Sequence, residues 1–166
     1  MILKAKKHFG QHFLINENIA NSITESLNLK ICKNIIEIGP GKGVLTKFLI
    51  QKNANIKLIE IDLDCVNFIK ENFKNIDVIH NDFLQINLSG ISFKQYSIIG
   101  NFPYNISSQI LFKVLENRNS IVQLVGMFQK EVADRICSKP KSKKYGILSV
   151  LMQAYFNCEN LFNVGP

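Results

Sequence analysis

The segment Asn101–Tyr104, NFPY, places an amide side chain, a proline and an aromatic ring directly after an apolar run. The side-chain oxygen of Asn101 and the backbone carbonyl of Phe102 or Pro103 can each accept a hydrogen bond from an amine on a base. An adenine amine is a poor nucleophile because its lone pair is delocalised, and two such acceptors would localise that pair. Proline stiffens the turn, and Tyr104 offers a stacking face worth about 1–3 kcal/mol. Asn101, Pro103 and Tyr104 are therefore candidate catalytic residues for methyl transfer to adenine.

A glycine-rich segment follows an earlier apolar run. The residues GPGKG at 39–43 have glycines spaced G-x-G-x-G, a pattern that lets the backbone approach a nucleotide-type ligand. A phosphate-binding P-loop is disfavoured because Gly43, and neither serine nor threonine, follows Lys42. A dinucleotide fingerprint is disfavoured because Val44 stands at its third glycine position. The segment therefore indicates an adenosine-type ligand without a demanding phosphate.

Two acidic residues narrow the choice of ligand. Glu60 falls 21 residues after Gly39, where an acid at the end of a second strand can accept hydrogen bonds from both ribose hydroxyls. Asp82 ends a third apolar run and can accept from an adenine amine. The backbone around Gly39 and Gly41 would flank a methionine moiety. S-adenosyl-L-methionine fits this set of contacts and is the predicted cofactor.

Apolar periodicity predicts a scaffold that brings these residues together. Short apolar runs alternate with helix-like stretches, which is typical of an α/β fold with a doubly wound, mainly parallel sheet. Ligands of such sheets bind beyond the carboxyl ends of the strands, so the four segments would line one crevice. The expected strands are 34–38, 56–61, 77–82, 96–100, 121–128 and 159–164. The expected helices are 15–27 with Asn16 as its cap, 44–52, 64–73, 107–116, 130–136 and 147–155.

Composition limits the possible classes of protein. The 166 residues fit one domain, and 20 Lys plus Arg against 13 Asp plus Glu give a formal net charge of +7. This excess favours a polyanionic partner, although a solvated lysine surface explains it as well. No signal peptide or membrane-spanning run is found, which predicts a soluble cytoplasmic protein with no membrane association. The cysteines Cys32, Cys65, Cys137 and Cys158 lack metal-ligand spacing, so we expect reduced core residues and no metal.

In combination, several segments resemble a known family, the ribosomal RNA adenine dimethyltransferases. The resemblance is to the small-subunit (16S-type) enzymes, which dimethylate two adjacent adenosines in a hairpin loop near the 3′ end of the rRNA during ribosome biogenesis. It covers nearly the whole chain and implies a Rossmann-like class I S-adenosylmethionine-dependent methyltransferase fold over 1–166. The matching segments are KKHFGQHFL at 6–14, EIGPGKG at 37–43, IEID at 59–62, ND at 81–82, NFPYNIS at 101–107, FQKEVADR at 128–135 and SKKYGILSV at 142–150.

The resemblance also implies roles for individual residues. By position, it assigns cofactor contacts to His12, Leu14, Gly39, Glu60, Asp82 and Asn101, and target-base contacts to Asn101, Pro103 and Tyr104. His12 stands where the family commonly has asparagine. Both side chains form hydrogen bonds, so we expect the contact to be retained.

The basic residues gain an expected partner in the same way. The family binds structured RNA around the cofactor mouth, and the target base would be splayed into the pocket. We therefore expect a monomer that binds small-subunit rRNA in the pre-ribosomal subunit, with 1–14 as a basic arm. The residues expected near phosphates are Lys4, Lys6, Lys7, Lys130, Arg135, Lys141, Lys143 and Lys144; solvated lysines are the alternative for the 139–144 loop.

Family members continue beyond the position of Pro166 with a second aromatic, a seventh strand and a helical domain. The expected fold lacks the seventh strand and the C-terminal helical domain, which would leave an open sheet edge or a gap. Two functions stay open: an active adenine-N6,N6-dimethyltransferase, or a catalytically impaired remnant that binds cofactor or pre-ribosomal RNA without turnover. A large-subunit adenine methyltransferase that confers antibiotic resistance is a third reading, and SKKYGILSV and FQKEVADR fit it less well.

Overall fold

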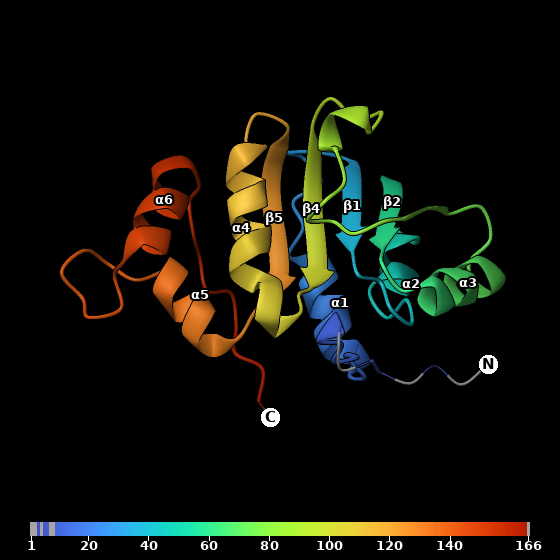
Figure 1. The fold of residues 1–166 in the computed structure, drawn as a ribbon, viewed down its shortest axis with the longest axis horizontal. Coiled ribbons are helices and arrows are strands. Elements are labelled where there is room, and N and C mark those ends of the chain that lie inside the picture. The colour runs from blue at the N-terminus through green and yellow to red at the C-terminus, as the bar shows by residue number, and fades with distance from the viewer. Residues whose placement is uncertain (1–2, 4, 7–8, 166) are drawn as a thin grey trace.

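Parallel strands form a five-stranded sheet with helices on both faces (Figure 1). The structure is a computed structural model that describes residues 3, 5–6 and 9–165. The strands are β1 (Asn34–Ile38), β2 (Asn55–Glu60), β3 (Asp77–His80), β4 (Tyr96–Asn101) and β5 (Ile121–Met127). The helices are α1 (Glu17–Glu25), α2 (Thr46–Leu49), α3 (Leu63–Asn72), α4 (Ser107–Glu116), α5 (Lys130–Ile136) and α6 (Ile147–Tyr155), with the short 3₁₀ helices η2 (Leu88–Gly90) and η3 (Tyr104–Ile106).

The strand order explains why distant segments meet. The order is β3-β2-β1-β4-β5, so the chain builds outward from β1 to β3 and then returns to place β4 beside β1. All neighbouring strands are parallel, so their carboxyl ends lie along the same edge of the sheet. The order reverses between β1 and β4, which is the position where open α/β sheets bind ligands. The predicted doubly wound parallel sheet is confirmed.

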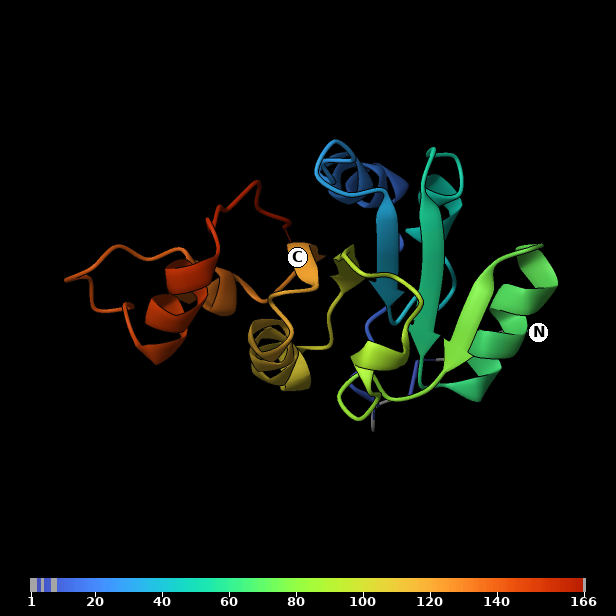
Figure 2. The same ribbon diagram turned by 90° about the horizontal axis from the view of Figure 1, so that it is seen from above.

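Successive residues of the central strands bury against opposite faces of the sheet. Ile35 and Ile99 pack in a cluster with α1 and α2, whereas Ile36 and Ile98 pack in a cluster with α4. Figure 2 shows α1 on one side of the sheet and α4 on the other. Because both faces are buried, these strands appear in the sequence as continuous apolar runs.

Helices α5 and α6 extend the molecule beyond the β5 edge of the sheet, next to α4 (Figures 1 and 2). An apolar cluster joins the three helices through Leu111, Leu115, Ile136, Leu148 and Met152. This cluster holds α5 and α6 against α4. Of the helices in the described part of the chain, none combines the length and the apolar character that crossing a membrane requires.

Two expected elements differ from the structure by more than two residues at an end. The helix expected at 44–52 is reduced to α2, because i→i+3 hydrogen bonds such as Phe48 N–H to the Leu45 carbonyl tighten the flanking turns. The strand expected at 159–164 is wrong, since these residues follow α6 without pairing to the described sheet. A short apolar run becomes a strand only when it pairs with a sheet edge. The outer edge of β5 is free in the described sheet, but residues 159–164 do not pair with it, and the sequence pattern alone does not contain that information.

The cysteines are only partly the core residues that were expected. Cys65 is buried, and the half-buried cysteines are Cys32, Cys137 and Cys158. Burial raises the pKa of the Cys65 thiol to about 12, with the nearby charge of Glu60 adding to the effect. This thiol is therefore protonated and unreactive at neutral pH.

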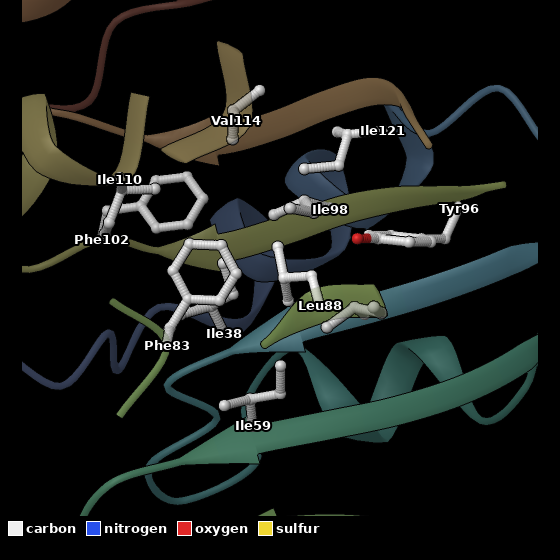
Figure 3. Packing of buried hydrophobic residues seen from close by; sticks show 11 residues of the cluster. Ile38, Ile59, Phe83, Leu88, Tyr96, Ile98, Phe102, Ile110, Val114 and Ile121 are labelled. Atoms are coloured by element: carbon white, nitrogen blue, oxygen red, sulfur yellow. The ribbon is translucent and has the colours of Figure 1, made fainter. Parts of the chain in front are cut away.

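Phe102 anchors the NFPY segment in the core. Its side chain is 1% exposed, and its ring lies over Gly100 of β4 and Gly126 of β5, which face each other in the sheet. A Cβ atom at Gly126 would overlap this ring. Phe128 packs against the ring at a centroid distance of 4.8 Å, and Figure 3 shows Phe102 among the buried residues of its cluster. The two glycines thus form the recess that fixes the turn after β4.

The hydroxyl of Tyr96 is buried in the same cluster and has no hydrogen-bond partner among the described residues. An unpartnered buried hydroxyl costs roughly 1–3 kcal/mol in lost hydration, so Tyr96→Phe is expected to raise the free energy of unfolding by about 1 kcal/mol. Urea unfolding followed by circular dichroism measures this change. Tyr155→Phe, at a side chain that is 57% exposed, serves as the control and should leave stability unchanged. A less stable Tyr96→Phe variant would contradict the prediction.

Candidate active site

A cavity lies at the carboxyl edge of the sheet, where β1 and β4 are neighbours. The loops that follow β1, β2, β3 and β4 all contribute to its wall, together with residues 9–14. Every predicted cofactor-binding and catalytic residue lines it: His12, Leu14, Gly39, Gly41, Glu60, Asp82, Asn101, Pro103 and Tyr104. The fold therefore brings together residues that the sequence spreads over more than half of the chain.

The cavity is acidic although the chain as a whole is basic. Its wall contains Glu37, Glu60 and Asp82, and the described lining residues include neither lysine nor arginine. Because burial raises the pKa of Glu37 to about 8, the negative charge of the wall at neutral pH comes from the other two carboxyl groups. The formal net charge of the chain is +7, so the charge of this wall is opposite in sign to the net charge of the molecule. Such a site disfavours a phosphate group and favours a ligand that carries positive charge.

Glu60 connects the glycine loop to the end of β2. Its side chain is 3% exposed; Oε2 accepts a hydrogen bond from the Gly41 N–H at 3.0 Å and Oε1 accepts one from the Asp62 N–H at 2.9 Å. Burial raises the pKa of the carboxyl, and the hydrogen bonds from the backbone amides oppose that shift. Each carboxylate oxygen can accept two hydrogen bonds, so Glu60 can support the loop and still accept from a ligand.

The glycine loop adopts the left-handed backbone conformation that its sequence predicts. Gly39, Gly41 and Gly43 have φ values of 63°, 55° and 74°. A Cβ at Gly41 would lie 2.9 Å from the ring of Phe13, and one at Gly43 would lie 2.5 Å from the ring of Phe73. The absence of a side chain at these two positions therefore makes room for Phe13 of the N-terminal segment and for Phe73, the residue after α3.

Asp82 begins the turn that follows β3. Its Oδ1 accepts a hydrogen bond from the Leu84 N–H at 2.8 Å, and Oδ2 has no hydrogen-bond partner in the described part of the chain. Lys113 of α4 fixes the same turn, because its Nζ donates to the carbonyls of Leu84 at 2.9 Å and Ile86 at 2.7 Å. Burial lowers the pKa of Lys113, and the charge of Asp82 opposes this. Lys113 has no distinguishing signal in the sequence, since a lysine on a helix normally faces solvent.

Asn101 is oriented by the N-terminal segment. Its Nδ2 donates to the backbone carbonyl of His12 at 2.8 Å, which leaves Oδ1 as the acceptor on this side chain. The ring of His12 stacks on Tyr104 with a centroid distance of 5.2 Å and an interplanar angle of 22°. Tyr104 remains 41% exposed. Position 12 therefore acts through its backbone carbonyl, which any residue would supply, and through its ring, which asparagine lacks.

The carbonyl of Pro103 is used within the turn itself. It accepts hydrogen bonds from the Ile106 N–H at 3.3 Å and from the Ser107 hydroxyl at 3.0 Å. No hydrogen bond to the carbonyl of Phe102 is found among the described residues. Of the two backbone acceptors that the sequence left open, Phe102 is therefore the one better able to receive a further hydrogen bond.

Lys6 is held by the start of α3. Its Nζ lies 2.6 Å from Asp62 Oδ1 and 2.7 Å from Asp64 Oδ2, and Gln11 Nε2 donates to Asp62 Oδ2 at 3.0 Å. Burial opposes ionisation of Asp62, but the hydrogen bonds from Lys6 and Gln11 outweigh it and lower the pKa of the carboxyl. This geometry differs from the phosphate contact expected for Lys6, because two carboxylates already neutralise its ammonium group.

The other basic residues lie on α5 and the loop that leads to α6. Asp134 pairs with Lys144 at 2.7 Å and more loosely with Lys130 at 3.9 Å. The remaining predicted phosphate contacts are Arg135, Lys141 and Lys143, which are exposed and form no ion pair within the described residues, and Lys4 and Lys7, which lie outside them.

Glu37 is a candidate functional residue that the sequence analysis named only as part of the glycine segment. It is 1% exposed, lines the cavity and accepts a hydrogen bond from the Thr46 hydroxyl at 2.7 Å. Burial raises the pKa of its carboxyl to about 8; the bond from Thr46 opposes this shift and the charge of Glu60 adds to it. An acid inside an apolar strand was the signal that could have revealed it.

The parallel sheet, its strand order and the position of the cavity are those of the class I S-adenosylmethionine-dependent methyltransferase fold. The chain is similar to the crystal structure of a dimethyladenosine transferase from Plasmodium falciparum, with a TM-score of 0.73 and 28% identity over 86% of this chain and 52% of that one. It is also similar to the structure of the 23S rRNA methyltransferase ErmE, with a TM-score of 0.65 and 26% identity over 75% of this chain and 50% of that one.

The ribosomal RNA adenine dimethylase profile matches residues 2–166, so the chain belongs to that family. It is 53% identical to the ribosomal RNA small subunit methyltransferase A of Flavobacterium johnsoniae and 49% identical to that of Cytophaga hutchinsonii, each over 98% of this chain. It spans 63% and 64% of the lengths of these two relatives. The family match over residues 2–166 confirms the resemblance that the sequence motifs indicated.

Proposed function

We propose that this chain transfers methyl groups from S-adenosyl-L-methionine to the N6 amines of two adjacent adenosines in a hairpin loop near the 3′ end of small-subunit rRNA. The observation that carries the proposal is that Asn101 and Tyr104 share one cavity with Glu60 and Asp82. Asn101 and Tyr104 suit a target base, whereas Glu60 and Asp82 suit an adenosine-containing methyl donor. Transfer between two bound groups requires such proximity.

The acidic wall supports S-adenosyl-L-methionine as the cofactor. When bound, this cofactor supplies a methyl group activated by a positively charged sulfonium, and a cation reduces the repulsion between neighbouring carboxylates. Glu60 would accept from the ribose hydroxyls, and Asp82 would accept from the adenine amine through the oxygen that its turn leaves open. The other proposed cofactor contacts are His12, Leu14, Gly39, Gly41 and Asn101.

The turn after β4 would prepare the amine of the target base. Asn101 Oδ1 and the carbonyl of Phe102 would each accept one N–H, which draws the lone pair of the nitrogen out of the ring. Pro103, with φ of −58°, keeps the turn rigid, and Tyr104 would stack on the base. The amine proton leaves after the nitrogen has become cationic, so no general base is required and positioning supplies most of the rate.

The proposed partner is small-subunit rRNA within the pre-ribosomal subunit. The contrast between an acidic cavity and a chain with a formal net charge of +7 supports this partner, because phosphates would contact basic residues outside the cavity while the base enters it. Lys6 is left out of the proposed phosphate contacts, since Asp62 and Asp64 hold it. We further propose a cytoplasmic monomer. The proposed phosphate contacts are Lys4, Lys7, Arg135, Lys141 and Lys143, together with Lys130 and Lys144, which share the single carboxylate of Asp134 and so keep a net positive charge.

The test incubates the 166-residue chain with unmethylated small ribosomal subunits and methyl-labelled cofactor. The wild-type chain is expected to label rRNA adenosines. Asn101→Ala is expected to lower the rate about 100-fold or more, because it removes one preorganised acceptor for the amine. Asn157→Ala changes an exposed asparagine outside the cavity and should retain wild-type activity.

Equilibrium dialysis with labelled cofactor, carried out beside the transfer assay, measures cofactor binding. Cofactor binding without transfer by the wild-type chain would contradict the transferase and support the catalytically impaired remnant. Absence of both cofactor binding and transfer would contradict the transferase and a remnant that binds the cofactor.

A further inference from the structure

A lysine of α4 holds the turn that follows β3. The Nζ atom of Lys113 donates to the backbone carbonyls of Leu84 at 2.9 Å and Ile86 at 2.7 Å, and it lies 5.5 Å from the centroid of the Phe83 ring. No backbone N–H of the described residues donates to either carbonyl. Both carbonyls therefore depend on this one side chain.

The same turn forms one wall of the candidate active site. Asp82, Phe83 and Leu84 line the cavity, whereas Lys113 does not. The Oδ1 atom of Asp82 accepts a hydrogen bond from the Leu84 N–H at 2.8 Å. The carboxyl group in the cavity is thus bound to the residue whose carbonyl Lys113 holds, so a shift of that residue moves the carboxyl group as well.

A charged donor suits this position better than a neutral one. Leu84 and Ile86 are half-buried and pack against the apolar cluster of Phe83. A carbonyl without a donor loses its hydration there and gains nothing in return. Hydrogen bonds from an ammonium group are stronger than those from a neutral group. Lys113 therefore holds the turn more firmly than an uncharged side chain of the same length could.

Helix α4 also supports the turn that would receive the target base. The hydroxyl of Ser107, the first residue of the helix, donates to the Pro103 carbonyl at 3.0 Å. One helix therefore holds the NFPY turn at its first residue and the turn after β3 through Lys113. Phe83 and Phe102, one from each turn, pack in the same cluster (Figure 3). The relative position of the two turns thus depends on α4.

We propose that Lys113 is a positioning residue for cofactor recognition, which holds the turn after β3 so that the open carboxylate oxygen of Asp82 meets the exocyclic amine of the cofactor adenine. The inference rests on the proposed function and deepens it, since it names the side chain behind the selectivity for adenine. Lys113 acts through Asp82 and does not touch the cofactor. A lysine that only stabilised the fold would leave this selectivity unchanged.

The test compares two ligands that cannot donate a methyl group. They are S-adenosyl-L-homocysteine and S-inosyl-L-homocysteine, which carries a carbonyl in place of the exocyclic amine. Isothermal titration calorimetry measures their binding to the 166-residue chain. The wild type is expected to bind the adenine compound about 10-fold more tightly or better, the effect of one hydrogen bond. Lys113→Met is expected to bind it about 10-fold less tightly than the wild type and to bind the inosine compound equally well, so the selectivity is lost.

Further variants separate recognition from folding. Asp82→Ala is expected to lose the selectivity, and Lys113→Met added to it should reduce the affinity for the adenine compound no further, because the lysine acts through that carboxyl group. Lys113→Arg keeps a cation with several donors and should restore part of the selectivity. Lys70→Met, at an exposed lysine of α3, is the matched control and should bind both compounds as the wild type does. Circular dichroism confirms that each variant is folded.

Equal selectivity in the wild type and Lys113→Met would overturn the inference, as would additive losses of affinity in the double variant. If Lys113→Met does not fold, Lys113→Gln, which is uncharged and one atom shorter, takes its place with the same expected loss of selectivity. Methyl transfer to ribosomal subunits is measured separately. Selectivity that depends on Lys113 without transfer would support the inference and contradict the proposed activity, whereas transfer by a wild type that binds both compounds equally would overturn this inference alone.

Discussion

The Glu37→Gln variant is expected to lose little thermal stability between about pH 5 and about pH 8, an interval over which the wild-type chain becomes markedly less stable. The carboxyl of Glu37 has a pKa of about 8 in the folded protein, raised by its burial. In the unfolded chain it returns to the ordinary glutamate value of about 4.3.

The direction of the effect follows from proton binding. Between these two pKa values the folded state keeps a proton on Glu37 that the unfolded state has released. Raising the pH therefore favours unfolding until the folded pKa is passed, and the loss is of the order of 3–5 kcal/mol. Glu60, whose pKa is also raised by burial, adds a smaller dependence of the same sign that remains in the variant.

Differential scanning calorimetry across this pH range measures the effect. Glutamine keeps an oxygen that can accept from Thr46, so the variant removes the titration with little change in shape. Glu71→Gln, at an exposed glutamate on α3, is the matched control and should follow the wild-type profile. Parallel profiles for the wild type and Glu37→Gln would contradict the prediction.

Phe102→Ala is expected to lower the free energy of unfolding by about 3–5 kcal/mol, because it empties the recess over Gly100 and Gly126. Domains of this size have a total stability of about 5–15 kcal/mol, so this is a large fraction of it. The turn that carries Asn101 would also lose its anchor. We therefore expect methyl transfer to fall more steeply than the folded fraction alone requires.

Urea unfolding gives the stability change, and the transfer assay gives the activity per folded molecule. Phe102→Leu is a milder variant for use if the alanine chain does not fold, with an expected loss of about 1–2 kcal/mol. Phe162→Ala, at a side chain that is 41% exposed, controls for the chemistry of the substitution. A loss as small as that of Phe162→Ala would mean that Phe102 does not anchor the turn.

Local patterns predicted most of the fold correctly. Four expected elements agree with the structure at both ends: the helices at 107–116, 130–136 and 147–155 and the first strand. In each of them the apolar pattern of the segment itself is sufficient, because the residues next to it in the sequence do not favour a different structure. The first helix begins after Asn16, whose side chain accepts from the N–H groups of Asn18 and Ile19 as a cap should. The apolar run at 159–164 failed as a strand because pairing depends on a distant edge.

Site residues were predictable from the sequence where they follow directly on a strand. Glu60, Asp82 and Asn101 each follow an apolar run, and parallel strands place all such ends along one edge. The role of Lys6 was not predictable, because its partner Asp62 lies 56 residues away. The same holds for Lys113, whose contacts lie 27 and 29 residues earlier in the chain.

The sequence by itself determined the sheet, the acids at the strand ends and the NFPY turn, because these depend on periodicity and on spacing within single segments. Only the tertiary structure decided how the N-terminal segment joins the site, through the bond from Asn101 to the His12 carbonyl across 89 residues. It also decided that Glu37 lines the cavity. Contacts between distant segments arise from packing the whole chain, so no local pattern specifies them.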